Sequence, residues 1–190
     1  WYTGNFALQF KDSFTCVSGL KSRFYNIANF NGTAYRSNYA NGFYYDDFSI
    51  ATIHSDWTIN AGTWNINTNT LFQSDQVLTN TNIYAPLTQT NSSYLYHFKM
   101  KINGSGTNKR AGIHFFCDNP TQSNRGNSYM VYFRDDNNTV QIYKCTANAI
   151  SAPLTNDATT IPTNTWFDVK ITYDATTGII TIYKDDIQVS

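Results

Sequence analysis

The sequence contains no glutamate, and all 13 of its acidic residues are aspartates. Long helices draw heavily on Glu, Lys, Ala and Leu, whereas the Thr, Tyr, Phe, Ile and Val that are common here suit pleated sheets. The absence of Glu also excludes the paired glutamates on which most glycoside hydrolases depend. The composition therefore predicts an all-β protein.

Charge is scarce as well, because charged residues make up only 14% of the chain and the 13 basic residues balance the acidic ones. Soluble domains usually carry ~25% charged residues. The longest basic run is Lys109-Arg110, whereas a nucleic-acid-binding protein normally has a basic excess or stripe. We therefore expect no nucleic-acid partner.

No apolar run approaches the ~20 residues of a transmembrane helix, and no signal peptide is visible. Low charge combined with many Asn, Thr and Tyr residues is typical of secreted proteins, so we expect an extracellular or cell-surface location. The chain starts without Met and stops at Ser190, two or three residues into a predicted strand. These ends predict a piece of a longer polypeptide or assembly, or an edge completed by a strand from another chain.

Cysteine is limited to Cys16, Cys117 and Cys145, with no C-x-x-C pair of the kind that zinc sites use. The predicted strand order places one strand between Cys117 and Cys145, which separates them by ~9.5 Å. A disulfide needs Cα atoms within ~7 Å. We therefore expect Cys117 and Cys145 to be free.

Alternation of apolar and polar residues marks the strands. From Tyr94 to Ile102 every second residue is apolar, as in a half-buried antiparallel strand, and the same holds from Phe167 to Tyr173. Turn residues punctuate the chain every 8–12 residues, which is typical of a sandwich or barrel. The predicted strands are 62–67, 70–74, 76–79, 82–85, 94–103, 109–118, 128–134, 139–145, 165–173, 179–184 and 187–189.

Residues 1–42 differ from the rest. They are rich in Gly, Asn, Ser and aromatic residues and alternate only weakly. We predict that they form a short β-rich segment, which the end of a preceding domain would explain, and that 43–190 form the sandwich.

Several segments resemble bacterial modules of the concanavalin A-like lectin/glucanase superfamily, close to laminin-G-like domains. Asp46-Asp47-Phe48-Ser49, Trp57 and Gly62-Thr63-Trp64 resemble the opening of such modules. The segments that resemble their central strands and late hairpin are 110–116, 126–133, 140–144, 166–174 and 178–183. The resemblance implies an antiparallel jelly-roll β-sandwich over about 43–190, and the composition suggests a bacterial surface protein.

No catalytic residue is predicted. Hydrolases of this superfamily carry Glu-x-Asp-x-x-Glu, which this chain cannot form. The pairs Asp46-Asp47, Asp135-Asp136 and Asp185-Asp186 are adjacent, so on a strand their side chains would point to opposite faces, and the last two pairs lie in predicted turns. His114 lies on a central strand, but the motifs of lyases that use His and Tyr do not match.

The polar loop 118–127 is the predicted ligand site, because loops at the ends of sandwich strands often carry binding residues. Its donors are Asn119, Gln122, Asn124, Arg125 and Asn127. Beside them, Tyr94, Tyr129 or Trp64 would stack on a sugar. The alternative is an ordinary solvated loop, and Trp57, Trp64 and Trp166 are alternatively core residues.

Asp46 and Asp47 are the predicted metal ligands, because many lectin-like modules hold a structural calcium through Asp, Asn and main-chain oxygens. The alternative is that these carboxylates form hydrogen bonds at the start of a strand. The predicted function is a non-catalytic recognition or adhesion module that binds a glycan or a cell-surface or assembly protein. The alternatives are a purely structural domain of a secreted or cell-surface assembly and a polysaccharide lyase or hydrolase.

Overall fold

The computed structural model describes residues 44–104 and 107–190. The predicted N-terminal segment 1–42 and Cys16 lie outside the described residues. The described residues belong to two compact units. The smaller unit comprises 44–59, 63–74 and 83–90, and the larger unit comprises 60–62, 75–82, 91–104 and 107–190.

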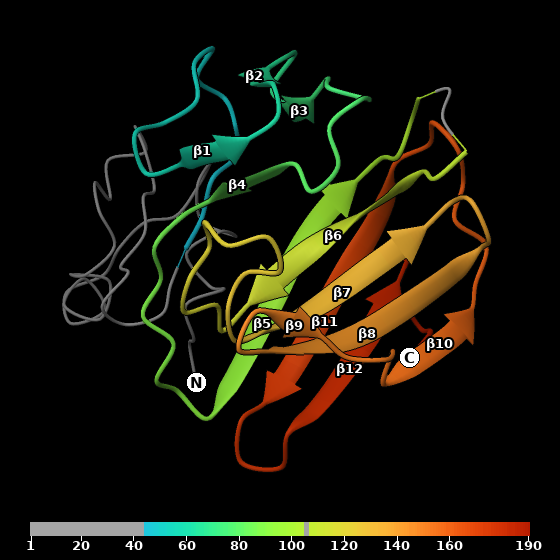
Figure 1. Ribbon diagram of the computed structural model, residues 1–190. Helices are drawn as coiled ribbons and strands as arrows, with labels where there is room; N and C mark the ends of the chain where they lie inside the picture. Colours follow the sequence, from blue (N-terminus) through green and yellow to red (C-terminus); the bar gives the residue numbers. More distant parts are fainter. Residues whose placement is uncertain (1–43, 105–106) are drawn as a thin grey trace, which may run out of the picture. The chain divides into compact units, whose positions relative to one another are not determined.

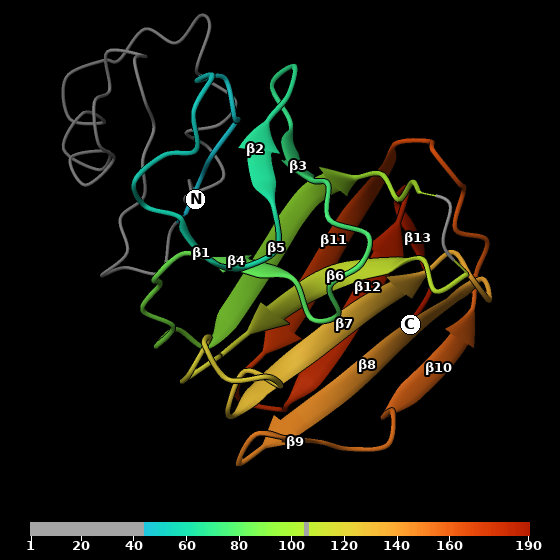
Figure 2. The ribbon, with the colours of Figure 1, turned by 45° about the horizontal axis from the view of Figure 1, so that its top comes forward.

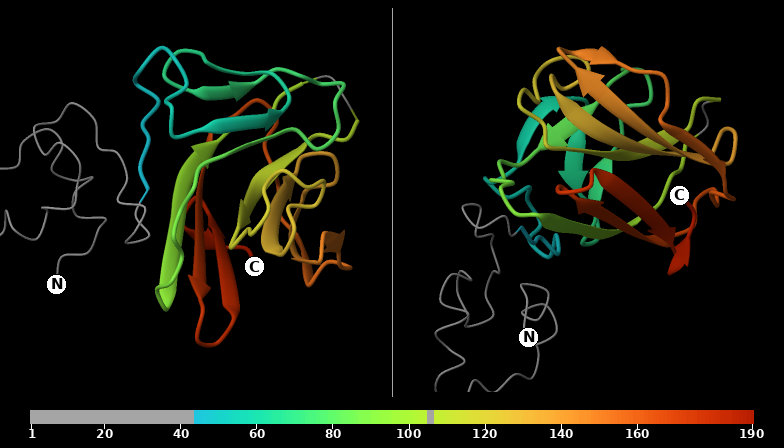
Figure 3. Two further views of the ribbon diagram at one scale, coloured as in Figure 1. Left: turned by 60° about the vertical axis from the view of Figure 1, so that its left-hand side comes forward. Right: turned by 90° about the horizontal axis from the view of Figure 1, so that it is seen from below.

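The larger unit is an antiparallel jelly-roll β-sandwich, which confirms the predicted all-β class (Figure 1). One sheet has the strand order β10-β8-β7-β6, with β9 paired to β8, and the other has the order β13-β12-β11-β5. Figure 3 shows these two sheets edge-on as separate layers. The strands are β5 (Ser93–Met100), β6 (Arg110–Phe115), β7 (Ser128–Arg134), β8 (Thr139–Thr146), β9 (Ala149–Ile150), β10 (Thr155–Ala158), β11 (Phe167–Asp174), β12 (Ile179–Lys184) and β13 (Ile187–Gln188).

The remaining strands form two short ribbons. β1 (Thr58–Ala61) is in a two-stranded sheet with β4 (Asn82–Tyr84). β2 (Trp64–Ile66) pairs with β3 (Leu71–Gln73), and the register places Trp64 opposite Gln73. The strands of the sandwich therefore start at Ser93, although the sequence predicted one sandwich from residue 43 onward.

The core forms between the sheets because the alternating strands turn their apolar faces inward. β11 pairs with β5 so that Val169 lies opposite Phe98 and Ile171 opposite Tyr96. The predicted inward faces of both strands are confirmed. The buried residues of this core are Tyr94, Ile102, Phe115, Val131, Phe133, Val140, Ile142, Ile161, Phe167, Val169, Ile171, Tyr173 and Ile182.

The described part of the chain lacks one predicted strand and contains three that were not predicted, β1, β9 and β10. The predicted strand 76–79 is absent, because the Asp75 side chain accepts hydrogen bonds from the Val77 and Leu78 amides, both at 2.9 Å, and bends the chain into a turn. β10 went unpredicted because its sequence, Thr155–Ala158, is polar. Figure 2 shows why it tolerates polar residues: β10 is at the free edge of its sheet.

Other predictions of local structure hold. The pairs Asp135-Asp136 and Asp185-Asp186 are in turns. Cys117 and Cys145 are free, as expected for residues separated by β7. Within the described ranges, no helix has the length and apolarity to cross a membrane.

Candidate functional site

The side of the β6–β10 sheet that faces away from the core carries an aromatic and polar surface, which we call the outer face. Alternation places every second residue of each strand there, and the antiparallel register aligns Gly112 with Tyr132 and Tyr132 with Gln141. Its members are Arg110, Gly112, His114, Met130, Tyr132, Arg134, Gln141, Tyr143 and Asn156.

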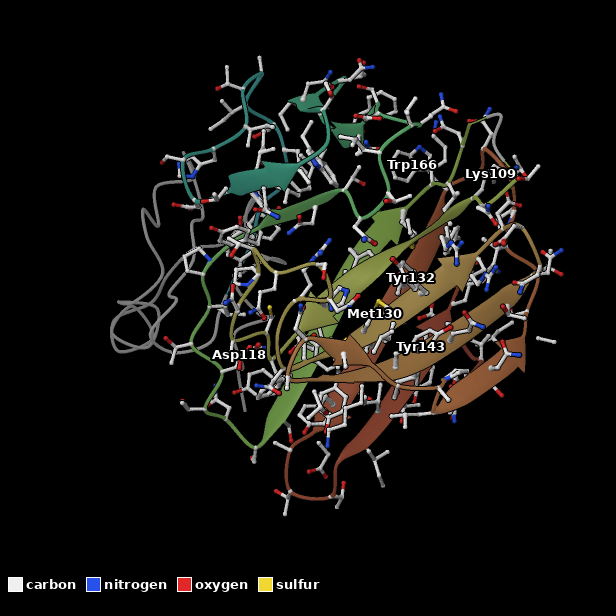
Figure 4. All side chains as sticks on the ribbon, viewed as in Figure 1. Lys109, Asp118, Met130, Tyr132, Tyr143 and Trp166 are labelled. Carbon is white, nitrogen blue, oxygen red and sulfur yellow. The ribbon has the colours of Figure 1, made fainter. Side chains whose placement is uncertain are left out.

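Two tyrosines occupy the centre of the outer face. The rings of Tyr132 and Tyr143 pack edge to face with centroids 6.5 Å apart, and Figure 4 shows both beside Met130. The Tyr143 hydroxyl donates to Gln141 Oε1 at 2.9 Å, and Gln141 Nε2 donates to Asn156 Oδ1 at 2.9 Å. This chain of hydrogen bonds fixes Tyr143. Within the described part of the chain, the Tyr132 hydroxyl has no hydrogen-bond partner.

Beside Tyr132, the neighbouring strand β6 carries no side chain on the outer face. Gly112 is its cross-strand neighbour on β6 and is exposed. β6 and β7 approach so closely here that a Cβ on residue 112 would lie 1.8 Å from the Val131 carbonyl oxygen. Glycine in a strand often marks such an approach, or a place where a ligand reaches the backbone. A ligand that stacks on Tyr132 therefore meets no side chain at position 112.

Charged residues gather at the end of the outer face where β7 turns into β8. Arg134 donates to Asp136 through Nε at 3.1 Å and through Nη2 at 2.5 Å. This hydrogen bonding holds the pKa of Asp136 below its usual value and raises that of Arg134. Lys109 forms a second ion pair with Asp135 at 2.5 Å and lowers the pKa of Asp135.

His114 marks the other end of the outer face. Its Nδ1 lies 3.1 Å from the hydroxyl oxygen of Ser128, which is buried. Burial lowers the pKa of His114 from 6.5 to about 4, and the charge of Arg125 acts in the same direction. The imidazole is therefore neutral at neutral pH and serves as a polar, uncharged side chain.

The predicted loop residues are largely engaged in hydrogen bonds, some within the loop and some to Asn80 and Asn148 outside it. Arg125 is only 7% exposed. Its guanidinium donates to the carbonyl oxygens of Gln122, Ser123 and Asn80. Its backbone has a φ of 62°. Arg125 thus acts as an internal brace of the loop.

Two other loop residues are also engaged in hydrogen bonds. Asn124 bonds twice to Asn148, at 2.8 Å through both its backbone N–H and its side chain. Asn127 binds the Asp118 carboxylate through its backbone N–H at 2.7 Å and its side-chain amide at 2.5 Å.

Asn119 accepts a hydrogen bond from the Thr121 hydroxyl at 2.9 Å, whereas Gln122 is exposed. Gln122 is therefore an exposed member of the predicted set, and among the described residues its side chain makes no hydrogen bond. The role of these loop residues in binding stays a prediction.

The predicted sugar-stacking rings lie elsewhere. Tyr94 is 8% exposed within the core, and Tyr129 packs against Tyr173 with ring centroids 5.4 Å apart. Trp64 belongs to the smaller unit. The structure thus turns Tyr94 and Tyr129 toward the sandwich interior, because they alternate in phase with core residues such as Val131. Sequence reasoning missed Tyr132 and Tyr143, although their positions one residue out of phase with the core already marked them as outward-facing.

The prediction from the sequence that Trp166 is a core residue is wrong. Its side chain is 47% exposed, and Lys101 Nζ lies 5.3 Å from the ring centroid. Figure 4 shows Trp166 on the larger unit, away from Tyr132 and Tyr143. The reason is again phase, because Phe167 points inward and its neighbour must point outward.

Asp46 and Asp47 form local hydrogen bonds, as the alternative interpretation predicted, but they do not lie at the start of a strand, since the first strand of the described residues is β1 at Thr58. Asp46 accepts from the Phe48 amide at 2.9 Å and from Trp57 Nε1 at 3.0 Å, and Asp47 accepts from the Ser49 amide at 3.0 Å. Residues 44–104 and 107–190 contain no group of three or more His, Cys or Asp side chains that could hold a metal ion. The calcium site stays a prediction.

Comparison with known proteins supports the fold. No family model matches the chain, and no curated protein matches it in sequence. Among solved structures, the chain is similar to the carbohydrate-binding module CBM66 from Bacillus subtilis, with a TM-score of 0.58 and 20% sequence identity. The similarity covers 71% of this chain and 77% of that module. At this identity the likeness shows a shared sandwich fold.

Proposed function

We propose that this chain is a non-catalytic glycan-binding module and that the outer face of the β6–β10 sheet is its binding surface. The observation that carries the proposal is the Tyr132–Tyr143 pair beside the exposed Gly112. The structural likeness to a carbohydrate-binding module supports it.

The chemistry of the outer face suits a sugar. A pyranose or furanose ring has a C–H face that packs on an aromatic ring, and hydroxyls at its rim that need hydrogen-bond partners. Tyr132 would supply the ring and an unengaged hydroxyl. Gly112 leaves room for the sugar beside that ring, and the Gln141–Asn156 network keeps Tyr143 in place without a change on binding.

Membership of the concanavalin A-like superfamily, an extracellular or cell-surface location and a role in adhesion belong to the same proposal. A module that attaches a larger protein to a polysaccharide works outside the cell, where such polymers occur. The alternative is a structural domain of a surface assembly with no small ligand. Glycan binding itself distinguishes the two.

The test is a panel of soluble polysaccharides measured by affinity electrophoresis and calorimetry. We expect Tyr132→Ala to weaken binding at least tenfold, about 1.4 kcal/mol. Tyr183→Ala is the matched control, because Tyr183 lies on β12 and alternates out of phase with the core residue Ile182. It removes a tyrosine from the other sheet, and its affinity should equal that of the wild type.

Two results would contradict the proposal. Binding to no polysaccharide of the panel would favour the structural alternative. Loss of binding in Gln122→Ala but not in Tyr132→Ala would return the site to the 118–127 loop.

A further inference from the structure

We propose that the outer face selects glycans with carboxylate groups, such as polyuronates, and that Arg110 is the residue that recognises the carboxylate. This inference rests on the proposed function and adds the substrate class. It depends on three features of the described residues: an uncompensated guanidinium, its distance from Tyr132, and the absence of a side chain between them.

Arg110 is the charged residue of the outer face without an ion-pair partner among the described residues. Its cross-strand neighbour is Arg134. Arg134 uses both oxygens of Asp136, and Lys109 uses Asp135. The charge of Arg110 helps to lower the pKa of Asp136, but the two side chains form no hydrogen bond or ion pair. The two cation–aspartate pairs cancel, which leaves one positive charge at this end.

Exposure makes that charge available. Arg110 is exposed, whereas Arg134 and Lys109 are half-buried. A guanidinium presents two parallel N–H groups that match the two oxygens of a carboxylate, so the contact is directional as well as electrostatic. Placing Arg110 opposite another arginine costs stability through repulsion, and a bound anion would relieve that repulsion.

The position of Arg110 fits a sugar stacked on Tyr132. Arg110 and Gly112 are two residues apart on β6, which separates them by ~7 Å, and Gly112 lies directly across from Tyr132. The flexible Arg110 side chain spans that distance. Because Gly112 has no side chain, nothing on β6 stands between the guanidinium and the ring. A uronate on Tyr132, or its neighbour in the polymer, would therefore bring its carboxylate to Arg110.

The experiment compares one polymer in two chemical states. De-esterified homogalacturonan displays free carboxylates, and its methyl-esterified form has the same backbone with those charges masked. We expect the wild type to bind the de-esterified polymer at least tenfold more tightly, with an affinity that falls as salt increases. Further uronate polymers, such as alginate, and neutral polysaccharides complete the panel.

Variants then assign the effect to one residue. Arg110→Gln should remove the preference for the free acid, and Arg110→Lys should keep the salt dependence but lose affinity because Lys lacks the bidentate fork. The control is Lys99→Gln, which removes the same charge from an exposed position on β5 in the other sheet. Its preference should equal that of the wild type. Melting curves check that each variant is folded.

The outcomes separate the inference from the proposed function. Binding to neutral polysaccharides without preference for the free acid overturns the inference and leaves the glycan-binding proposal intact. A preference that persists in Arg110→Gln, or tighter binding of a sulfated neutral polysaccharide through Arg110, also overturns the inference. Binding to no glycan at all overturns the proposed function.

Discussion

His114 shows how a single half-buried side chain links stability to pH. The unfolded chain takes up a proton on this residue near its ordinary pKa of 6.5, whereas the folded protein does so near pH 4 because of burial and then Arg125. Between these values the unfolded state binds more protons, so the free energy of unfolding decreases as the pH falls from 7 toward 4.

We therefore expect wild-type protein to lose about 2 kcal/mol of stability between pH 7 and pH 5 through His114. In His114→Gln this loss should be absent, since Gln keeps a polar group near Ser128 and does not titrate. Urea unfolding at the two pH values measures the difference, because the other ionisable groups are the same in both proteins. Equal losses in the two proteins would contradict the role of His114.

Gly112 is a second residue at which the structure predicts the effect of a substitution on stability. An alanine there would place its Cβ 1.8 Å from the Val131 carbonyl oxygen, so β6 and β7 would have to separate. We expect Gly112→Ala to lower the free energy of unfolding by about 3 kcal/mol. Gly178→Ala is the control: its φ of 76° is strained for alanine, but no atom lies within 4 Å of the added Cβ, so the cost should be about 1 kcal/mol. Equal costs would show that the strand contact is not tight.

Asp46 and Asp47 allow a direct test of the calcium prediction. If these carboxylates hold a structural ion, calcium should raise the melting temperature above that measured with chelator, since a ligand of the folded state stabilises it. Asp46→Asn should remove this increment. It should also lower the melting temperature in chelator, because Asp46 accepts from Trp57 Nε1. Identical wild-type melting curves with calcium and with chelator would rule the site out.

The loop between β6 and β7 is the clearest prediction at the scale of elements. Arg125 braces this loop, and replacement by methionine would remove the guanidinium donor from three carbonyl oxygens. Among the described residues, only the carbonyl of Gln122 keeps a second donor, the backbone N–H of residue 125. We expect Arg125→Met to destabilise the protein by about 3 kcal/mol or more. Arg110→Met, at an exposed arginine, should cost about 0.5 kcal/mol or less. Chemical denaturation measures both, and a small cost in Arg125→Met would show that the loop does not depend on this residue.

At the scale of elements, the sequence predicted the strands whose own residues alternate between apolar and polar. Strands with a clear period of two were found with nearly correct limits, such as Ser128–Arg134 and Ile179–Lys184. The polar edge strand Thr155–Ala158 was missed because its partner β8, not its own apolar pattern, holds it in place. The predicted strand at 76–79 was wrong because one Asp75 side chain captured two amides.

The candidate site was harder to predict than the fold. The polar loop residues looked like ligand donors, but sequence alone could not show that Arg125 and Asn127 bond within the loop. Tyr132 was predictable as outward-facing from its phase relative to Val131 and Phe133. Its contact with Tyr143 and the missing side chain at Gly112 could not be predicted, because both depend on the register of β6, β7 and β8.

For the molecule as a whole, the central claim is that a glycan binds on the outer face of the β6–β10 sheet. The two methionines of the chain suit a direct test, because Met130 lies on that face and Met100 packs against the core from β5. Met130 is only 3% exposed, but its side chain lies beside the two rings that a sugar would contact, whereas the half-buried Met100 packs against the core.

The decisive measurement is a methyl NMR titration of selectively labelled methionine with a polysaccharide that the protein binds. Each signal is assigned by its absence in Met130→Leu or Met100→Leu. The account predicts that the Met130 signal shifts in proportion to occupancy while the Met100 signal stays fixed. Saturating binding with an unmoved Met130 signal would place the glycan elsewhere and contradict the account.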